Sequence, residues 1–210
     1  MAEYAEAMRL VELTCARLCH DLSSLVGSLN GALELVADDW PTTDEAFALA
    51  RQAARELMWR LRLLRAAWGE GGPELPLAGL RDLSAGLIGA HRLTLDLTGL
   101  PDDAVFVPPM ARAVLNVLLL ANESLPAAGQ IWFTGAPTDL YVSIAGPGAA
   151  WPAGLPLCLV DPAAAMAAFS NPRSIQMPLT ALLARGLGLR LSVLMAAGSG
   201  DPPPLRLSVS

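Results

Sequence analysis

The chain has 210 residues, enough for one large domain or two small ones with a real hydrophobic core. Apolar residues make up 53% of it and charged residues 16%, which excludes a generally disordered protein. The net charge is −6 and all 14 basic residues are arginines, which excludes lysine nucleophiles and disfavours nucleic-acid binding. No apolar run approaches the roughly 18 residues of a membrane helix, and the acidic N-terminal segment is unlike a signal peptide. We therefore expect a cytoplasmic protein with neither a membrane nor a nucleic-acid partner.

The three cysteines and two histidines are too few and too irregularly spaced for a disulfide framework or a zinc site. We expect Cys15, Cys19 and Cys158 to be reduced core residues, and no metal or cofactor to be bound stably by this chain. His91 stands at the edge of a predicted strand, where a structural or incidental role is expected. Core or edge packing is expected for three aromatic residues: Trp132, Trp151 and Phe169.

Two long helices are predicted first, over residues 4–38 and 43–68. Pro41 interrupts the helical pattern between them, and Thr43 is a predicted N-cap followed by Asp44 and Glu45 in the first turn. A short connection between two such helices makes an antiparallel hairpin. One hairpin alone cannot bury its apolar stripe. Either the rest of the chain covers that stripe, or a second copy docks to form a four-helix bundle.

A glycine- and glutamate-rich stretch at 69–74 is the clearest boundary, and it separates a hairpin domain (1–69) from a second domain (75–210). In the second domain, helices are predicted at 79–90, 109–125, 161–170 and 176–187. Strands are predicted at 92–98, 130–134, 139–145, 189–195 and 204–209. This order predicts an α+β fold, with one mixed sheet covered by helices.

His20 points away from the apolar stripe of the first helix, which runs from Val11 to Val36 on a helical wheel. Small or polar residues surround it on the outer face: Arg17, Ser23, Ser24, Gly27, Ser28 and Gly31. Each glycine within a helix costs about 1 kcal/mol relative to alanine. The pattern indicates either a docking platform with a reactive histidine at its centre, or a surface histidine beside glycines that allow close helix packing.

An exposed imidazole is a competent phosphoryl acceptor, because its neutral form is available near pH 7. Asp21 could hold one ring nitrogen of His20 as N–H and so aim the lone pair of the other at phosphorus. The transferring group is highly anionic and requires a metal or cations. Because no carboxylate cluster is apparent near His20, we expect a partner to supply Mg²⁺.

Leu18–Asp21 followed by Asn30–Leu35 resembles the ChpT-type bacterial histidine phosphotransferases, and more broadly the H box of sensor histidine kinases. The resemblance implies a hairpin that dimerises into a four-helix bundle, followed by a degenerate, Bergerat-like copy of the kinase ATP-binding domain. It makes His20 the phosphoacceptor and Asp21 its acidic partner. Ser24 stands where kinases often have Asn or Thr.

One position departs from the kinase pattern: Leu25 replaces a common proline, which weakens the case for kinase-like helix bending. The family moves a phosphoryl group from one receiver-domain aspartate to its own histidine and then to another receiver. The implied partners are a second copy of the chain, the receiver of a CckA-like hybrid kinase, and CtrA-like response regulators. A role in cell-cycle control is implied as well.

The ATP-site motifs of kinases are incomplete in the second domain. Asn116 matches the first position of the kinase Asn-x-x-x-Asn motif, but Leu120 occupies the second and cannot ligate Mg²⁺. Ile144 stands where kinases read adenine with Asp. Glycines remain at 146 and 148, and Gly186–Leu189 resembles the last phosphate-binding glycine box. We expect this domain to buttress the bundle without binding ATP productively.

The second helix carries arginines on one flank, and counting back from the turn places residues 59–62, which include Arg60 and Arg62, level with His20. They form either a solvated face or an anchor for the acidic edge of a receiver. The arginines concerned are Arg51, Arg55, Arg62 and Arg65. Three alternatives to a phosphotransferase stay open: an ATP-dependent histidine kinase, a non-catalytic dimeric scaffold that binds receivers, and a phosphatase in which Ser24 positions water.

Overall fold

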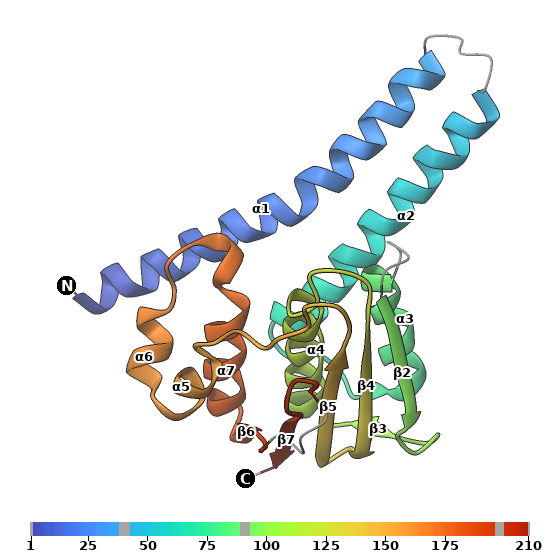
Figure 1. Cartoon of the computed structure of the whole chain (residues 1–210). Coiled ribbons are helices and arrows are strands. Elements are labelled where there is room, and N and C mark those ends of the chain that lie inside the picture. Colours follow the sequence, from blue (N-terminus) through green and yellow to red (C-terminus); the bar gives the residue numbers. More distant parts are fainter. Residues whose placement is uncertain (1, 38–42, 89–92, 196–199, 210) are drawn as a thin grey trace.

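The computed structural model describes residues 2–37, 43–88, 93–195 and 200–209 (Figure 1). Helices α1 (Ala2–Ala37) and α2 (Thr43–Trp68) form the predicted antiparallel hairpin. Small side chains allow their close approach, since Ala32 of α1 and Ala46 of α2 are buried. The first turn of α2 contains the predicted acidic pair. The turn at Pro41 and the side chain of Thr43 lie outside the described part of the chain.

The hairpin projects beyond the rest of the molecule and leaves much of its apolar surface uncovered (Figure 1). Its exposed apolar residues include Val11, Val26 and Leu33 of α1, and Phe47, Met58 and Leu61 of α2. The remainder of the chain therefore covers only part of the apolar stripe.

Residues after the hairpin form a five-stranded mixed sheet, as predicted, in the order β2-β4-β5-β7-β6. Only β2 and β4 run parallel among its pairs. The strands are β2 (Leu93–Gly99), β4 (Gly129–Ala136), β5 (Asp139–Ala145), β6 (Leu189–Val193) and β7 (Leu205–Val209). A separate pair was not predicted, because two-residue strands leave no sequence period: β1 (Leu75–Pro76) and β3 (Val105–Phe106).

Helices pack against one face of this sheet. Alternate residues of β5 are fully buried, which is the pattern of a sheet covered on one side: Leu140, Val142 and Ile144. The helices are α3 (Leu77–Ile88), α4 (Pro108–Glu123), α5 (Leu155–Val160), α6 (Pro162–Ala167) and α7 (Gln176–Gly186), with a 3₁₀ turn, η1 (Pro172–Ser174). Sequence reasoning missed α5, which lies in a Gly/Pro-rich segment.

The expected packing of the aromatic residues is largely confirmed, whereas the expected burial of the cysteines is confirmed for one of the three. Phe169 is buried and the Trp151 indole donates to the Pro203 carbonyl (2.7 Å), so the predicted packing roles hold for both. Cys158 is buried, but the prediction of core thiols is wrong for Cys15 and Cys19, which are exposed because the apolar stripe of α1 is only partly covered. Trp132 is half-buried, as edge packing would require. The prediction for His91 lies outside the described residues.

Among the described helices, none has the length and apolar character that crossing a membrane would require.

Candidate functional site

His20 lies near the middle of α1, and its side chain is 57% exposed. Its Nδ1 atom lies 3.4 Å from Oδ1 of Asp21, the next residue in the helix. With the proton on Nδ1, the ring donates to this carboxylate and the lone pair is left on Nε2. The helix thus presents an accessible imidazole whose tautomer is biased by its neighbour.

Arg17 holds the Asp21 carboxylate from one helical turn earlier. Its Nε lies 2.9 Å from both carboxylate oxygens, and the two side chains are only 14% and 15% exposed. Charge-assisted hydrogen bonds of this length are among the stronger polar contacts in proteins. Asp21 is therefore fixed on one side by Arg17 while it faces His20.

The same guanidinium ties α1 to the sheet and helices that follow the hairpin (residues 75–209), which we call the layered domain. Its Nη2 donates to the carboxylate of Glu123, the last residue of α4. Its Nη1 lies 3.4 Å and 3.3 Å from the carbonyl oxygens of Pro172 and Arg173 in η1. All three guanidinium nitrogens thus have partners within the chain, whereas the sequence pattern suggested that Arg17 faces a binding partner. Glu123 lies 106 residues away, so no local pattern could reveal this contact.

A cavity of about 420 Å³ opens between His20 and the layered domain. Besides the charged residues already described, it is lined by Pro152, Arg173, Ser174 and Met177. The described residues contain no group of three or more His, Cys, Asp or Glu side chains able to hold a metal ion.

Two positive and two negative side chains gather behind His20. Burial lowers the pKa of Arg60, whose Nε is buried and without a hydrogen-bond partner within the described part of the chain. Burial also raises the pKa of Glu123, against the opposing pull of Arg17. For Arg17, burial lowers the pKa, but Glu123 and Asp21 outweigh it and the net direction is upward. Sequence reasoning missed Glu123 as a site residue.

The strip of small residues beyond His20 is open in this chain. Ser24, Gly27 and Gly31 are exposed, and a Cβ added at either glycine would meet no atom within 4 Å. Neighbouring hydroxyls turn back onto the helix, since Ser23 donates to the Cys19 carbonyl (2.6 Å) and Ser28 to that of Ser24 (3.0 Å). The surface is therefore low and accessible to another backbone.

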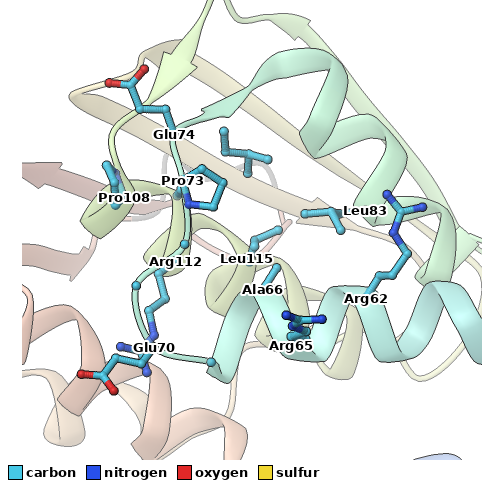
Figure 2. A pocket seen from close by; sticks show the side chains of 15 residues that line it. Arg62, Arg65, Ala66, Glu70, Pro73, Glu74, Leu83, Pro108, Arg112 and Leu115 are labelled. Carbon is cyan, nitrogen blue, oxygen red and sulfur yellow. The ribbon is translucent and has the colours of Figure 1, made fainter.

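Arg62 lines a different cavity from His20. That cavity, of about 500 Å³, lies among α2, α3, α4 and the 69–74 segment, and Figure 2 shows Arg62 and Arg65 beside it. Side chains two positions apart on a helix point roughly in opposite directions, about 200° apart. Because Arg60 lies within electrostatic reach of Asp21, Arg62 is turned away from the histidine. The structure therefore does not bring Arg62 and His20 together.

The side-chain amide of Asn116 is engaged in hydrogen bonds within the chain. Its Nδ2 donates to the carbonyls of Ala67 (2.7 Å) and Arg112 (2.9 Å), while its Oδ1 accepts from Gln176 (3.1 Å). Leu120 and Ile144, which stand at the two other kinase-motif positions, are fully buried. The hydrogen bonds of the Asn116 side chain thus connect α2, α4 and α7.

The resemblance of Gly186–Leu189 to a phosphate-binding box is wrong in structural terms. Gly186 ends α7 and Leu189 begins β6, so the segment lies at a helix C-terminus. The amide of Leu187 donates to the Leu183 carbonyl, and Gly188 adopts a positive φ of 70°. A helix C-terminus carries partial negative charge and disfavours phosphate. These glycines terminate a helix.

Comparisons with known proteins agree with this architecture. A model of the family described as histidine phosphotransferase C-terminal domain matches residues 77–199. The chain is 26% identical to the protein phosphotransferase ChpT of Brucella abortus (strain 2308) over 196 residues, which is 89% of this chain and 90% of the relative. A solved structure of a bacterial phosphotransferase superposes with a TM-score of 0.71 at 21% identity, covering 96% of this chain and 95% of that one. The structural match concerns the fold.

Proposed function

This chain belongs to the histidine phosphotransferase family, and we propose that His20 is the residue that carries the phosphoryl group in a cytoplasmic phosphorelay. The observation that carries the proposal is the accessible imidazole of His20 with Nδ1 directed at Asp21. Its phosphoryl donor is the phospho-aspartate of a receiver domain, such as that of a CckA-like hybrid kinase. Its acceptor is the aspartate of a CtrA-like response regulator.

The proposed chemistry consists of two successive in-line phosphoryl transfers, first from the donor receiver to His20 and then from His20 to the acceptor receiver. Nε2 of His20 attacks phosphorus, the N–P bond forms, and the bond from phosphorus to the aspartyl oxygen breaks, which frees the donor's carboxylate. The ring keeps its proton on Nδ1, and Asp21 offsets the positive charge that develops on the imidazole. In the second half, the acceptor aspartate attacks phosphorus and the N–P bond breaks. The receiver is expected to bring the Mg²⁺ that screens the phosphoryl oxygens.

The receiver docks, in this proposal, along the outer face of α1. Ser24, Gly27 and Gly31 form the open strip, and Ser23 and Ser28 border it with hydroxyls that are folded back. Small side chains let the partner's backbone and phosphorylated aspartate approach the imidazole closely. Ser24, one turn after His20, borders the reacting atoms.

We propose that residues 1–69 act as the dimerisation and phosphotransfer hairpin. The support is the set of apolar side chains left exposed on both helices, among them Leu33 and Phe47. A second copy that covered them would complete a four-helix bundle, whose helices pack through such apolar positions. The outer face with His20 would stay free, because it lies across α1 from Val26 and Leu33.

Residues 75–210 are proposed to be a Bergerat-like domain that binds no nucleotide in the kinase manner. Asn116 has its amide engaged by three internal partners, and Leu120 offers no ligand atom. These features disfavour the alternative of an ATP-dependent kinase. ATP binding near micromolar affinity in titration calorimetry would revive that alternative.

The test uses a panel of receiver domains from the same genome, phosphorylated with ³²P-labelled acetyl phosphate and freed of excess reagent. Wild type and His20→Ala are mixed with each receiver in Mg²⁺. We expect an acid-labile, base-stable label on wild type alone. Label on His20→Ala would remove His20 as the acceptor. Tight receiver binding by both proteins without label on either would support a non-catalytic scaffold instead.

A further inference from the structure

Glu123 stands at an unfavourable place for a carboxylate. It is the last residue of α4, where the helix dipole is negative, and its side chain is only 24% exposed. Its partner is Arg17 of α1, and this ion pair joins the hairpin to the layered domain next to His20. The second ion pair of Arg17, with Asp21, lies within α1. An arrangement so disfavoured locally calls for a reason other than helix formation.

Stability does not supply that reason. Removing two opposite charges from water offsets most of the attraction between them, so a buried ion pair is weak evidence for stabilisation. Burial raises the pKa of Glu123 despite the adjacent guanidinium, so ionising this carboxyl works against folding. A second buried cation, Arg60, lies near the same acids. What the cluster provides is fixed geometry.

A continuous series of contacts connects Glu123 to His20 through Arg17 and Asp21. Glu123 and the η1 carbonyls hold Nη2 and Nη1 of Arg17, which leaves Nε directed at both oxygens of Asp21. Asp21 in turn faces Nδ1 of His20. Without Glu123, the Arg17 side chain could rotate toward solvent, and Asp21 would lose the partner that keeps it beside the ring.

We propose that Glu123 of the layered domain, acting through Arg17, is a positioning residue for the phosphotransfer step. The inference rests on the proposed function of His20. It gives the domain a part in the reaction: one of its side chains fixes the orientation of the catalytic pair His20 and Asp21. Glu123 itself touches neither the reacting nitrogen nor the phosphoryl group.

The experiment compares Glu123→Gln, which keeps shape and loses charge, with Asp139→Asn as a matched control. Asp139 makes a bidentate pair with Arg206 between β5 and β7, so the control breaks a similar pair elsewhere (2.7 and 2.8 Å). Single-turnover transfer is followed over a range of receiver concentrations. We expect Glu123→Gln to slow transfer at saturating receiver about tenfold, with the half-saturating concentration changed less than twofold. Asp139→Asn should match wild type.

A second readout excludes a merely structural effect. The ¹⁵N signals of the His20 ring, assigned with His20→Gln, report which nitrogen carries the proton in the free protein. We expect the Nδ1–H fraction to fall in Glu123→Gln and in Arg17→Lys, which keeps the charge but lacks the fork of donors. Asp21→Asn added to Glu123→Gln should slow transfer by much less than the product of the single effects, because both act through one chain of contacts.

An unchanged rate and an unchanged ring tautomer in Glu123→Gln would overturn the inference. So would single effects of Asp21→Asn and Glu123→Gln that simply multiply. If wild type accepts no label from any receiver, the proposed function fails, yet the tautomer measurement on the free protein still decides whether Glu123 orients the ring.

Discussion

The side chain of Gln176 reaches across from α7 and donates to Asn116 Oδ1 of α4 at 3.1 Å, inside a fully buried cluster. Asn116 also holds the carbonyl of Ala67 near the end of α2. One amide thus joins the hairpin to two helices of the layered domain. The residue that would serve a nucleotide in a kinase serves the junction between the two parts of this chain.

Asn116→Ala is therefore expected to destabilise the protein by about 2 kcal/mol, because a buried cluster loses the side-chain hydrogen bonds of Asn116 to the Ala67 carbonyl and the Gln176 amide. The Ala67 carbonyl keeps its longer contact with Arg112 (3.3 Å), and the Gln176 amide keeps the backbone carbonyl of residue 116 (3.2 Å), which limits the loss. Urea unfolding followed by circular dichroism measures the loss. Gln52→Ala is the control, since this exposed amide donates to Glu56, one turn later on the same helix (2.9 Å). Equal losses in the two variants would contradict a special role for the buried amide.

Asp21→Asn should slow phosphoryl acceptance about 100-fold or more. An asparagine can turn its amide N–H toward Nδ1 of His20, which moves the ring proton to Nε2 and blocks the nucleophilic lone pair. Quench-flow transfer from a labelled receiver gives the rate. Asp82→Asn, an exposed substitution on α3, should leave it unchanged. A wild-type rate in Asp21→Asn would show that the ring needs no acidic neighbour.

Gly27→Leu separates docking from folding. A Cβ added there would meet no atom within 4 Å apart from the backbone of its own helix, the position faces solvent, and leucine favours a helix over glycine by about 0.8 kcal/mol, so thermal stability should not fall. Receiver affinity, measured by titration calorimetry, should fall at least about tenfold, equivalent to 1.4 kcal/mol. Gly186→Leu, at an equally open helical position on α7, is the control. Unchanged affinity in Gly27→Leu would move the docking surface elsewhere.

The pH dependence of stability should report on Glu123. Its carboxyl faces Arg17 and Asp21 from α1 and Arg60 from α2, and burial raises its pKa above the ordinary 4.5. A raised pKa in the folded state gives stability that is present below 4.5 and lost as the pH rises through the folded value. Neutral Glu123→Gln lacks this loss. Relative to wild type, the variant should thus become more stable as the pH rises above 4.5, as measured by urea unfolding at each pH.

A constant difference between Glu123→Gln and wild type over that range would show that the carboxyl does not titrate differently in the two states. A widening deficit of the variant would mean that the ion pair with Arg17 outweighs burial.

Leu33→Glu tests the dimer. Leu33 is 46% exposed in one chain, and a charge there would be buried without a partner in a bundle interface. Analytical ultracentrifugation should give twice the 22.0 kDa chain mass for wild type and a single chain mass for the variant. Val160→Glu, an exposed apolar position on α5, should leave the mass unchanged. A monomeric wild type would contradict the bundle.

Elements with a strong hydrophobic periodicity could be predicted from the amino-acid sequence alone. The hairpin and the long strands were predictable, because a 3.6-residue or two-residue period over many positions reflects which face each element buries. The outward position of His20 followed from the same wheel. The pairs of residues that stand close in sequence, such as His20 and Asp21, were within reach of that reasoning.

The partners of those faces depend on how distant segments pack together, which the sequence patterns do not show. Glu123 reaches Arg17 from 106 residues away, and Gln176 reaches Asn116 from 60 residues away. Gly186 resembled a phosphate box in letters, yet it ends a helix whose carbonyl end disfavours an anion. Local patterns fix which side chains share a face. Which distant charge or amide satisfies a buried polar group depends on how the elements pack, and that choice leaves no periodic signal in the chain.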